Sequence, residues 1–131
     1  MYTSHPSEPV RLQKLYRKSQ LSPKDLEKKF EEAGRETVRL AAALLGYLEQ
    51  EDPYPAYRSY LKKRIRPAAV ALIEENRVSD LAKLQKEFGF SLVQLDLFLQ
   101  TAVAMKRINV MSWLLKQKAE LYGFPDRDFR L

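Results

Sequence analysis

The feature that most constrains this chain is the recurrence of apolar residues at the spacing of an α-helix in its first half. These residues are Leu26, Phe30, Ala33, Val38, Ala41, Leu45 and Leu48. Their helical spacing, mostly steps of three and four residues, places them on one side of a helix, whereas a strand would need strict alternation. Just before them, Ser22 can cap a helix and Pro23 suits its first turn. We therefore predict a long amphipathic helix over 23–50, in which Gly34 and Gly46 mark close helix contact, a kink or an early stop.

Two prolines in the segment EDPYPAY, residues 51–57, must end that helix, because proline cannot continue the hydrogen-bond ladder. A short helix follows from about Ala56 to Arg66, and Pro67 either begins the next helix or kinks a continuous one through AAVALIEEN. The apolar patterns predict further helices over 10–18, 78–88, 92–105 and 108–121. The alternation in VQLDLFL is also typical of a strand, but the QTAVAMKR that follows it favours a helix.

These patterns predict an all-α fold, a small helical bundle or a repeat-like array of about five to six helices with stacked antiparallel hairpins. A length of 131 residues fits one domain. We expect a flexible tail over 1–9 and a single helical domain over 10–131. Within that domain we expect N-terminal helices over 10–55, two repeat-like hairpins over 56–121 and a C-terminal tail over 122–131.

Composition and charge exclude some classes of function and leave others open. The chain has no cysteine, which excludes disulfides, thiolate catalysis and cysteine-based metal sites and suits a reducing, cytoplasmic location. No stretch approaches the roughly 20 apolar residues that a membrane-spanning helix requires, so we expect no integral membrane segment. The net charge of +6 is able to attract polyanions, acidic proteins or anionic membrane surfaces. The sign of the charge does not choose among these partners.

Two similar strings suggest an internal repeat. The residues Ala69-Val70-Ala71-Leu72 and Ala102-Val103-Ala104-Met105 begin 33 positions apart, and each precedes a polar break with an arginine and a second amphipathic segment. A period of about 33 residues is typical of a helix-turn-helix repeat unit. We expect such hairpins to stack, because one hairpin alone cannot bury its apolar face.

The second copy resembles an ankyrin repeat, and residues 66–121 as a whole resemble a degenerate pair of them. Leu99 and Ala102 resemble the buried positions of the family's first helix, and Lys106-Arg107 stand at its inter-helix turn. The earlier copy has Asn76-Arg77 at that turn. Both copies lack the family's Thr-Pro-Leu-His start, and the spacing slips by about three residues between helices. The resemblance implies a stacked surface for protein binding; generic packing of helical hairpins explains the same residues.

No pattern in the sequence predicts catalysis. The chain's one histidine, His5, lies in the expected tail, and the carboxylate clusters at 31–32, 49–52 and 74–75 are typical of solvated helix faces and ends. There is no glycine-rich phosphate loop, metal-ligand spacing or nucleophile elbow. We therefore predict that the protein is not an enzyme and uses no cofactor or metal.

The segment YPAYRSYLKKRIR, residues 54–66, is the most distinctive candidate surface. Its tyrosines lie at steps of three residues, which places them on one face of a helix among arginines and lysines. Such residues are favoured at protein interfaces, and they also suit phosphate contacts and stacking on bases. Alternatively, the tyrosines pack into the core and leave a solvated basic face. The leading prediction is non-catalytic protein binding to an unidentified partner, with nucleic-acid binding through the basic helices 10–18 and 57–66 as the alternative. The candidate contact residues are Tyr54, Tyr57, Arg58, Lys62, Lys63, Arg64, Lys106 and Arg107.

Overall fold

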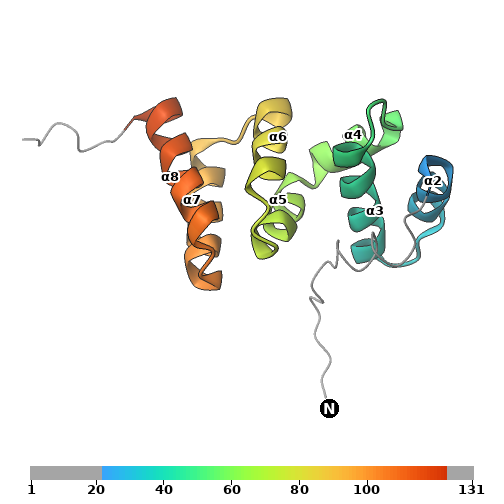
Figure 1. Cartoon of the computed structure of the whole chain (residues 1–131), viewed down its shortest axis with the longest axis horizontal. Coiled ribbons are helices and arrows are strands. Elements are labelled where there is room, and N and C mark those ends of the chain that lie inside the picture. Colours follow the sequence, from blue (N-terminus) through green and yellow to red (C-terminus); the bar gives the residue numbers. More distant parts are fainter. Residues whose placement is uncertain (1–21, 124–131) are drawn as a thin grey trace, which may run out of the picture. The chain divides into compact units, whose positions relative to one another are not determined.

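The computed structural model describes residues 22–123, and this part of the chain is all-helical, which confirms the predicted fold class (Figure 1). Its helices are α2 (Pro23–Glu32), α3 (Glu36–Glu49), α4 (Pro55–Lys63), α5 (Ile65–Glu74), α6 (Val78–Phe88), α7 (Leu92–Met105) and α8 (Ile108–Tyr122). The predicted tail 1–9, the predicted helix 10–18 and most of the predicted tail 122–131 lie outside the described residues. The contacts group the chain into two compact units, with the boundary inside α5 between Ala71 and Leu72.

The single helix predicted over 23–50 was wrong, because the chain leaves the helical conformation at residues 33–35. Ala33 and Arg35 both have extended backbone, with Gly34 between them, and α3 begins anew at Glu36. Glycine has a low helix propensity, so its placement here favours the break. The Arg39 side chain donates to the carbonyl oxygen of Ala33 at 2.8 Å and so satisfies a group that the end of α2 exposes. The predicted start of α2 is confirmed, since Ser22 Oγ accepts from the Asp25 amide.

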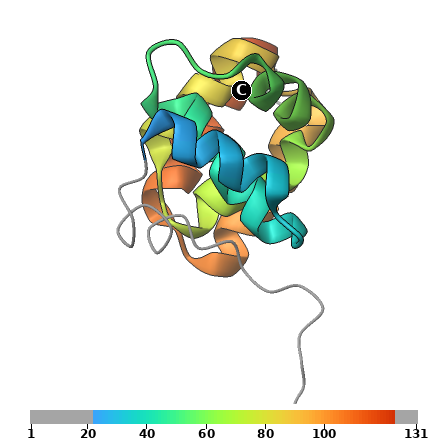
Figure 2. The same cartoon turned by 90° about the vertical axis from the view of Figure 1, so that its right-hand side faces the viewer.

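In the first unit α3 packs against both α2 and α4. Figure 2 shows α2, in blue, lying across the teal α3. A continuous run of α3 is buried, from Leu40 to Gly46, because small alanines allow neighbouring helices to approach on more than one side. Gly46 lies against the ring of Tyr57 on α4, so close helix contact is the one of the three predicted alternatives that the structure has at this glycine. Pro67 lies in the first turn of α5, after a break at Arg64 that separates α5 from α4.

In the second unit two tight turns of the same conformation reverse the chain. Asn76 and Lys106 both have left-handed backbone, with φ of 56° and 59°. The next residue in each turn, Arg77 or Arg107, donates its amide to the carbonyl of Leu72 or Ala102, in both cases at 2.9 Å. The turns therefore make Leu72 equivalent to Ala102, whereas the comparison of the two strings paired Leu72 with Met105. The repeat period given by the turns is thus three residues shorter than the period given by the two similar strings.

The start of α7 and the core beneath it are defined by local sequence. Ser91 and Gln94 form a capping box, in which each side chain accepts from the other residue's amide. Phe90 and Phe98 are buried with their rings edge to face at 5.1 Å between centroids. Phe98 therefore packs in the core. The Trp113 side chain is partly exposed.

Candidate functional site

The tyrosines of the candidate segment are mostly buried. Tyr57 has no exposed surface and Tyr60 retains 9%, so neither ring is available to a partner in this structure. Phe30 of α2 meets both rings edge to face, with 5.2 Å between centroids in each case. Tyr54 is partly exposed, and its hydroxyl donates to Glu31 at 2.5 Å. The alternative interpretation, that the tyrosines pack into the core, describes Tyr57 and Tyr60.

The hydroxyl of Tyr57 is buried and has no hydrogen-bond partner among the described residues. Burial raises the pKa of Tyr57 to about 12, because the charged phenolate loses more hydration than the neutral phenol. A buried hydroxyl without a partner costs free energy that the phenylalanine ring would not. The ring of Tyr57 therefore serves packing, and its oxygen adds nothing to stability.

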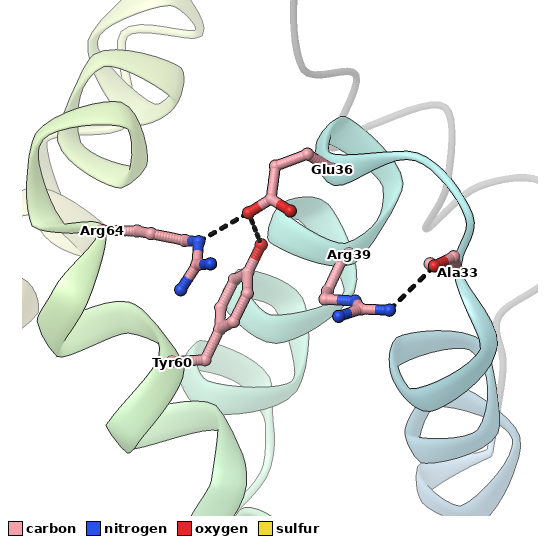
Figure 3. Close-up of polar contacts among 5 residues, drawn as sticks. All are labelled: Ala33, Glu36, Arg39, Tyr60 and Arg64. Carbon is pink, nitrogen blue, oxygen red and sulfur yellow. Dashed lines mark hydrogen bonds and ion pairs between the residues drawn. The ribbon is translucent and has the colours of Figure 1, made fainter.

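Glu36 at the start of α3 connects α3 to α4 (Figure 3). Its carboxylate accepts hydrogen bonds from the Tyr60 hydroxyl and from Arg64 Nε, the latter at 2.5 Å. The hydrogen bond from Tyr60, with further help from Arg64, lowers the pKa of Glu36. The guanidinium of Arg64 also lies over the Tyr60 ring, 4.1 Å from its centroid. Arg64 is therefore engaged in holding the fold, which leaves it poorly placed for a partner.

The remaining cations of the segment form an exposed surface, which we call the basic face and define as Arg58, Lys62 and Lys63 of α4 with Arg66 of α5. All four side chains are exposed. The sequence contains no acidic residue between Asp52 and Glu74, so this stretch carries only positive charge. The amphipathic pattern of α4 explains the division, since its aromatic positions bury against α3 and turn the intervening cations to solvent. The basic face can pair with carboxylates or phosphates.

The other predicted contact residues, Lys106 and Arg107, lie in the second unit at the turn between α7 and α8. Lys106 is exposed, but Arg107 is partly buried. The Arg107 guanidinium donates to the backbone carbonyls of Glu74 at 2.8 Å and Met105 at 3.0 Å. Arg107 thus satisfies backbone carbonyls at the end of α5 and in its own turn, and its role is to stabilise the fold. Of this pair, only Lys106 presents its charge to solvent.

The described residues contain no cluster of three or more histidine or carboxylate side chains able to hold a metal ion. In the same part of the chain, no helix combines the length and the apolar character needed to cross a membrane. One surface depression in the first unit is open and lined by both acidic and basic side chains of α2 together with Ala33 and Val38. This mixed lining selects no particular class of small molecule.

One feature that sequence reasoning missed is an exposed apolar surface on the last hairpin. We call it the outer face and define it as Leu92 and Val103 of α7 with Ile108, Leu115 and Tyr122 of α8. The signal in the sequence was the seven-residue spacing of Ile108, Leu115 and Tyr122, which marks one stripe of a helix. The prediction treated α8 as the second helix of a stacked hairpin. It explained the side of α8 that is buried, but it made no statement about the opposite side.

Comparison with known proteins adds no relative to this description. No protein-family model, no curated protein and no solved structure matches the chain. The resemblance of residues 66–121 to ankyrin repeats therefore stays a prediction.

Proposed function

We propose that this protein is a non-catalytic interaction module that binds an acidic protein surface through the basic face. The observation that carries the proposal is the division of α4 into a buried aromatic side and an exposed cationic side. Tyr57 and Tyr60 anchor the helix to α2 and α3, so Lys62 and Lys63 are presented from a fixed helix. A fixed helix loses little conformational freedom on binding, which favours affinity. We further propose a cytoplasmic location, on the absence of cysteine from the sequence.

The alternative candidate is nucleic-acid binding, which the same basic face favours because lysine and arginine contact phosphates regardless of sequence. Stacking on bases requires exposed aromatic faces, and the burial of Tyr57 and Tyr60 removes the two rings best placed for it. This alternative therefore predicts binding that depends on phosphate contacts alone. Such binding weakens steeply with salt, by about one power of the salt concentration for each phosphate contact.

The test compares wild type with the variant Lys62→Glu/Lys63→Glu/Arg66→Glu in affinity capture from a native lysate, with and without nuclease. A matched control, Lys24→Glu/Lys86→Glu/Lys116→Glu, changes the net charge equally at exposed positions elsewhere. Arg58 is left unchanged because it makes other interactions within the fold. Circular dichroism first confirms that both variants keep the wild-type helix content.

A protein partner that resists nuclease, is retained by the control and is lost by the basic-face variant supports the proposal. Recovered partners should also carry an excess of acidic residues, and salt should weaken the complex. Partners retained equally by both variants would contradict the assigned surface. Recovery that disappears with nuclease would move nucleic-acid binding into first place, to be measured with defined RNA and DNA oligonucleotides across a salt series.

A further inference from the structure

The large exposed apolar side chains of the described residues all lie on one helical hairpin. They are Leu92, Val93, Val103, Ile108, Leu115, Leu121 and Tyr122, and each belongs to α7 or α8. Helices α2 to α6 contribute none of them. Scattered exposed apolar residues are ordinary on a soluble protein, but a concentration on one element marks an interaction surface.

The spacing of these residues places most of them along one side of each helix, as an apolar stripe. On α8, Ile108, Leu115 and Tyr122 recur every seven residues, with the partly exposed Met111 between the first two. This is the pattern of a helix that packs along its length against another helix. The opposite side of α8 is already used, because Val110 and Leu114 are buried. On α7, Leu92 and Val103 share a side with the partly exposed Leu99.

An ion pair joins the two stripes into one surface. Lys118 of α8 contacts Asp96 of α7 at 2.8 Å, and their side chains remain 26% and 43% exposed. Both residues fall on the stripes, since Asp96 lies one turn from Leu92 and Lys118 one turn from Leu115. The outer face is therefore apolar with one acid and one base near its middle.

We propose that this chain forms a two-fold symmetric dimer in which the outer faces of two copies pack together. A two-fold axis through the middle of the face places Asp96 of each copy against Lys118 of the other, so the surface is complementary to itself in charge as well as in apolar character. The two stripes on each copy give a four-helix contact of the kind formed by helical hairpins. A nucleic acid would not use the apolar stripes. This proposal does not depend on the basic face, which lies on other helices.

The first test measures self-association of the full chain by sedimentation equilibrium over a wide range of protein concentration. Wild type should change from the mass of one chain to the mass of two. The variant Ile108→Glu/Leu115→Glu should raise the dimer dissociation constant by at least about a hundredfold, because it replaces two apolar contacts of the desolvated face by unpaired charges. Val93→Glu is the matched control, since Val93 is 75% exposed but lies off the stripe. It should leave the dissociation constant within about threefold of wild type.

The second test uses charge exchange, which only contact between copies can satisfy. Asp96→Lys alone gives two cations on the face and Lys118→Asp alone gives two acids, so each variant should be monomeric. An equimolar mixture of the two should dimerise, because each copy then faces opposite charge. A monomeric wild type, a dimer that survives Ile108→Glu/Leu115→Glu, or equal weakening by Val93→Glu would each overturn the proposal. A mixture that stays monomeric would overturn the two-fold register.

Discussion

Replacing Gly46 by alanine should destabilise this protein, although the same change in the interior of most helices stabilises them. Alanine in place of glycine within a helix gains about 0.5–1 kcal/mol. At Gly46, however, an added Cβ would lie 2.2 Å from Cε2 and 2.7 Å from Cζ of the Tyr57 ring. Both atoms belong to a side chain without exposed surface, so the ring has no room to move aside. Overpacking of this kind costs about 1–3 kcal/mol and can exceed that when no relaxation is possible.

We expect a net loss of about 2 kcal/mol in the free energy of unfolding, which corresponds to a fall of roughly 6–8 °C in the melting temperature. Urea denaturation followed by circular dichroism measures the first quantity, and a thermal melt measures the second. Gly34→Ala is the matched control, because a Cβ added there would meet no atom within 4 Å and the residue does not need a left-handed backbone. This control should be neutral or gain up to about 1 kcal/mol.

A double-mutant cycle with Tyr57→Leu identifies the cause, since leucine lacks the ring atoms that meet the added methyl group. In the Tyr57→Leu background, Gly46→Ala should recover its ordinary helical gain of about 0.5–1 kcal/mol. The two backgrounds should then differ by roughly 3 kcal/mol in the effect of the same substitution. Equal effects in both backgrounds, or a Gly46→Ala protein as stable as wild type, would refute the packing argument.

Three further predictions concern the polar groups of the fold. Tyr57→Phe should stabilise the protein by about 1 kcal/mol in urea denaturation, because it removes a buried hydroxyl without a partner. The same variant should lose less stability than wild type between pH 10 and about 12. Over this range Tyr57 of wild type ionises in the unfolded chain but not in the folded one. Lys106→Gly should add about 0.5–1 kcal/mol by relieving a left-handed lysine, and Asn76→Gly should add less because asparagine tolerates that conformation. Because the folded state lowers the pKa of Glu36, its contribution to stability is present above the ordinary value of 4.5 and is lost as the pH falls further. Glu36→Gln should therefore flatten acid denaturation curves in that range, with Glu32→Gln as the control.

The fold class followed from local rules that act within a few residues. Apolar spacing identified helices, Ser22 marked the start of α2, and the prolines of 51–57 marked the gap before α4. A kink or early stop at Gly34 was among the predicted alternatives, but the sequence did not select the break, because apolar residues resume at Val38 and the capping of Ala33 by Arg39 is a tertiary contact. The two-residue turns were placed at the correct residues, but similar letters in the two strings suggested a register that the hydrogen bonds do not follow.

The candidate surface was harder to predict than the fold, because helical periodicity shows which residues share a face but not which face is buried. Tyrosine and arginine are both ambiguous, since each can pack or be exposed with little change in sequence pattern. In α4 the tyrosines pack, and Arg64 turns back onto Glu36 while its neighbours Lys62 and Lys63 remain exposed. The seven-residue spacing of Ile108, Leu115 and Tyr122 likewise marks a stripe of α8, but it does not show that this stripe is exposed and that Val110 and Leu114 form the buried side.

The hydrogen bond from Arg107 to the carbonyl of Glu74 has a consequence for how the chain folds during translation. The two residues are 33 positions apart, so α5 emerges from the ribosome well before the side chain that closes its end. Until then water must solvate that carbonyl, and the end of α5 is free to fray. The end of α5 therefore gains its last hydrogen bond only after the following hairpin has been synthesised. Local stability in this unit should then increase from the N-terminal to the C-terminal hairpin as translation proceeds. A nascent chain halted just before Arg107 should show faster amide exchange at 74–77 than one halted after α8.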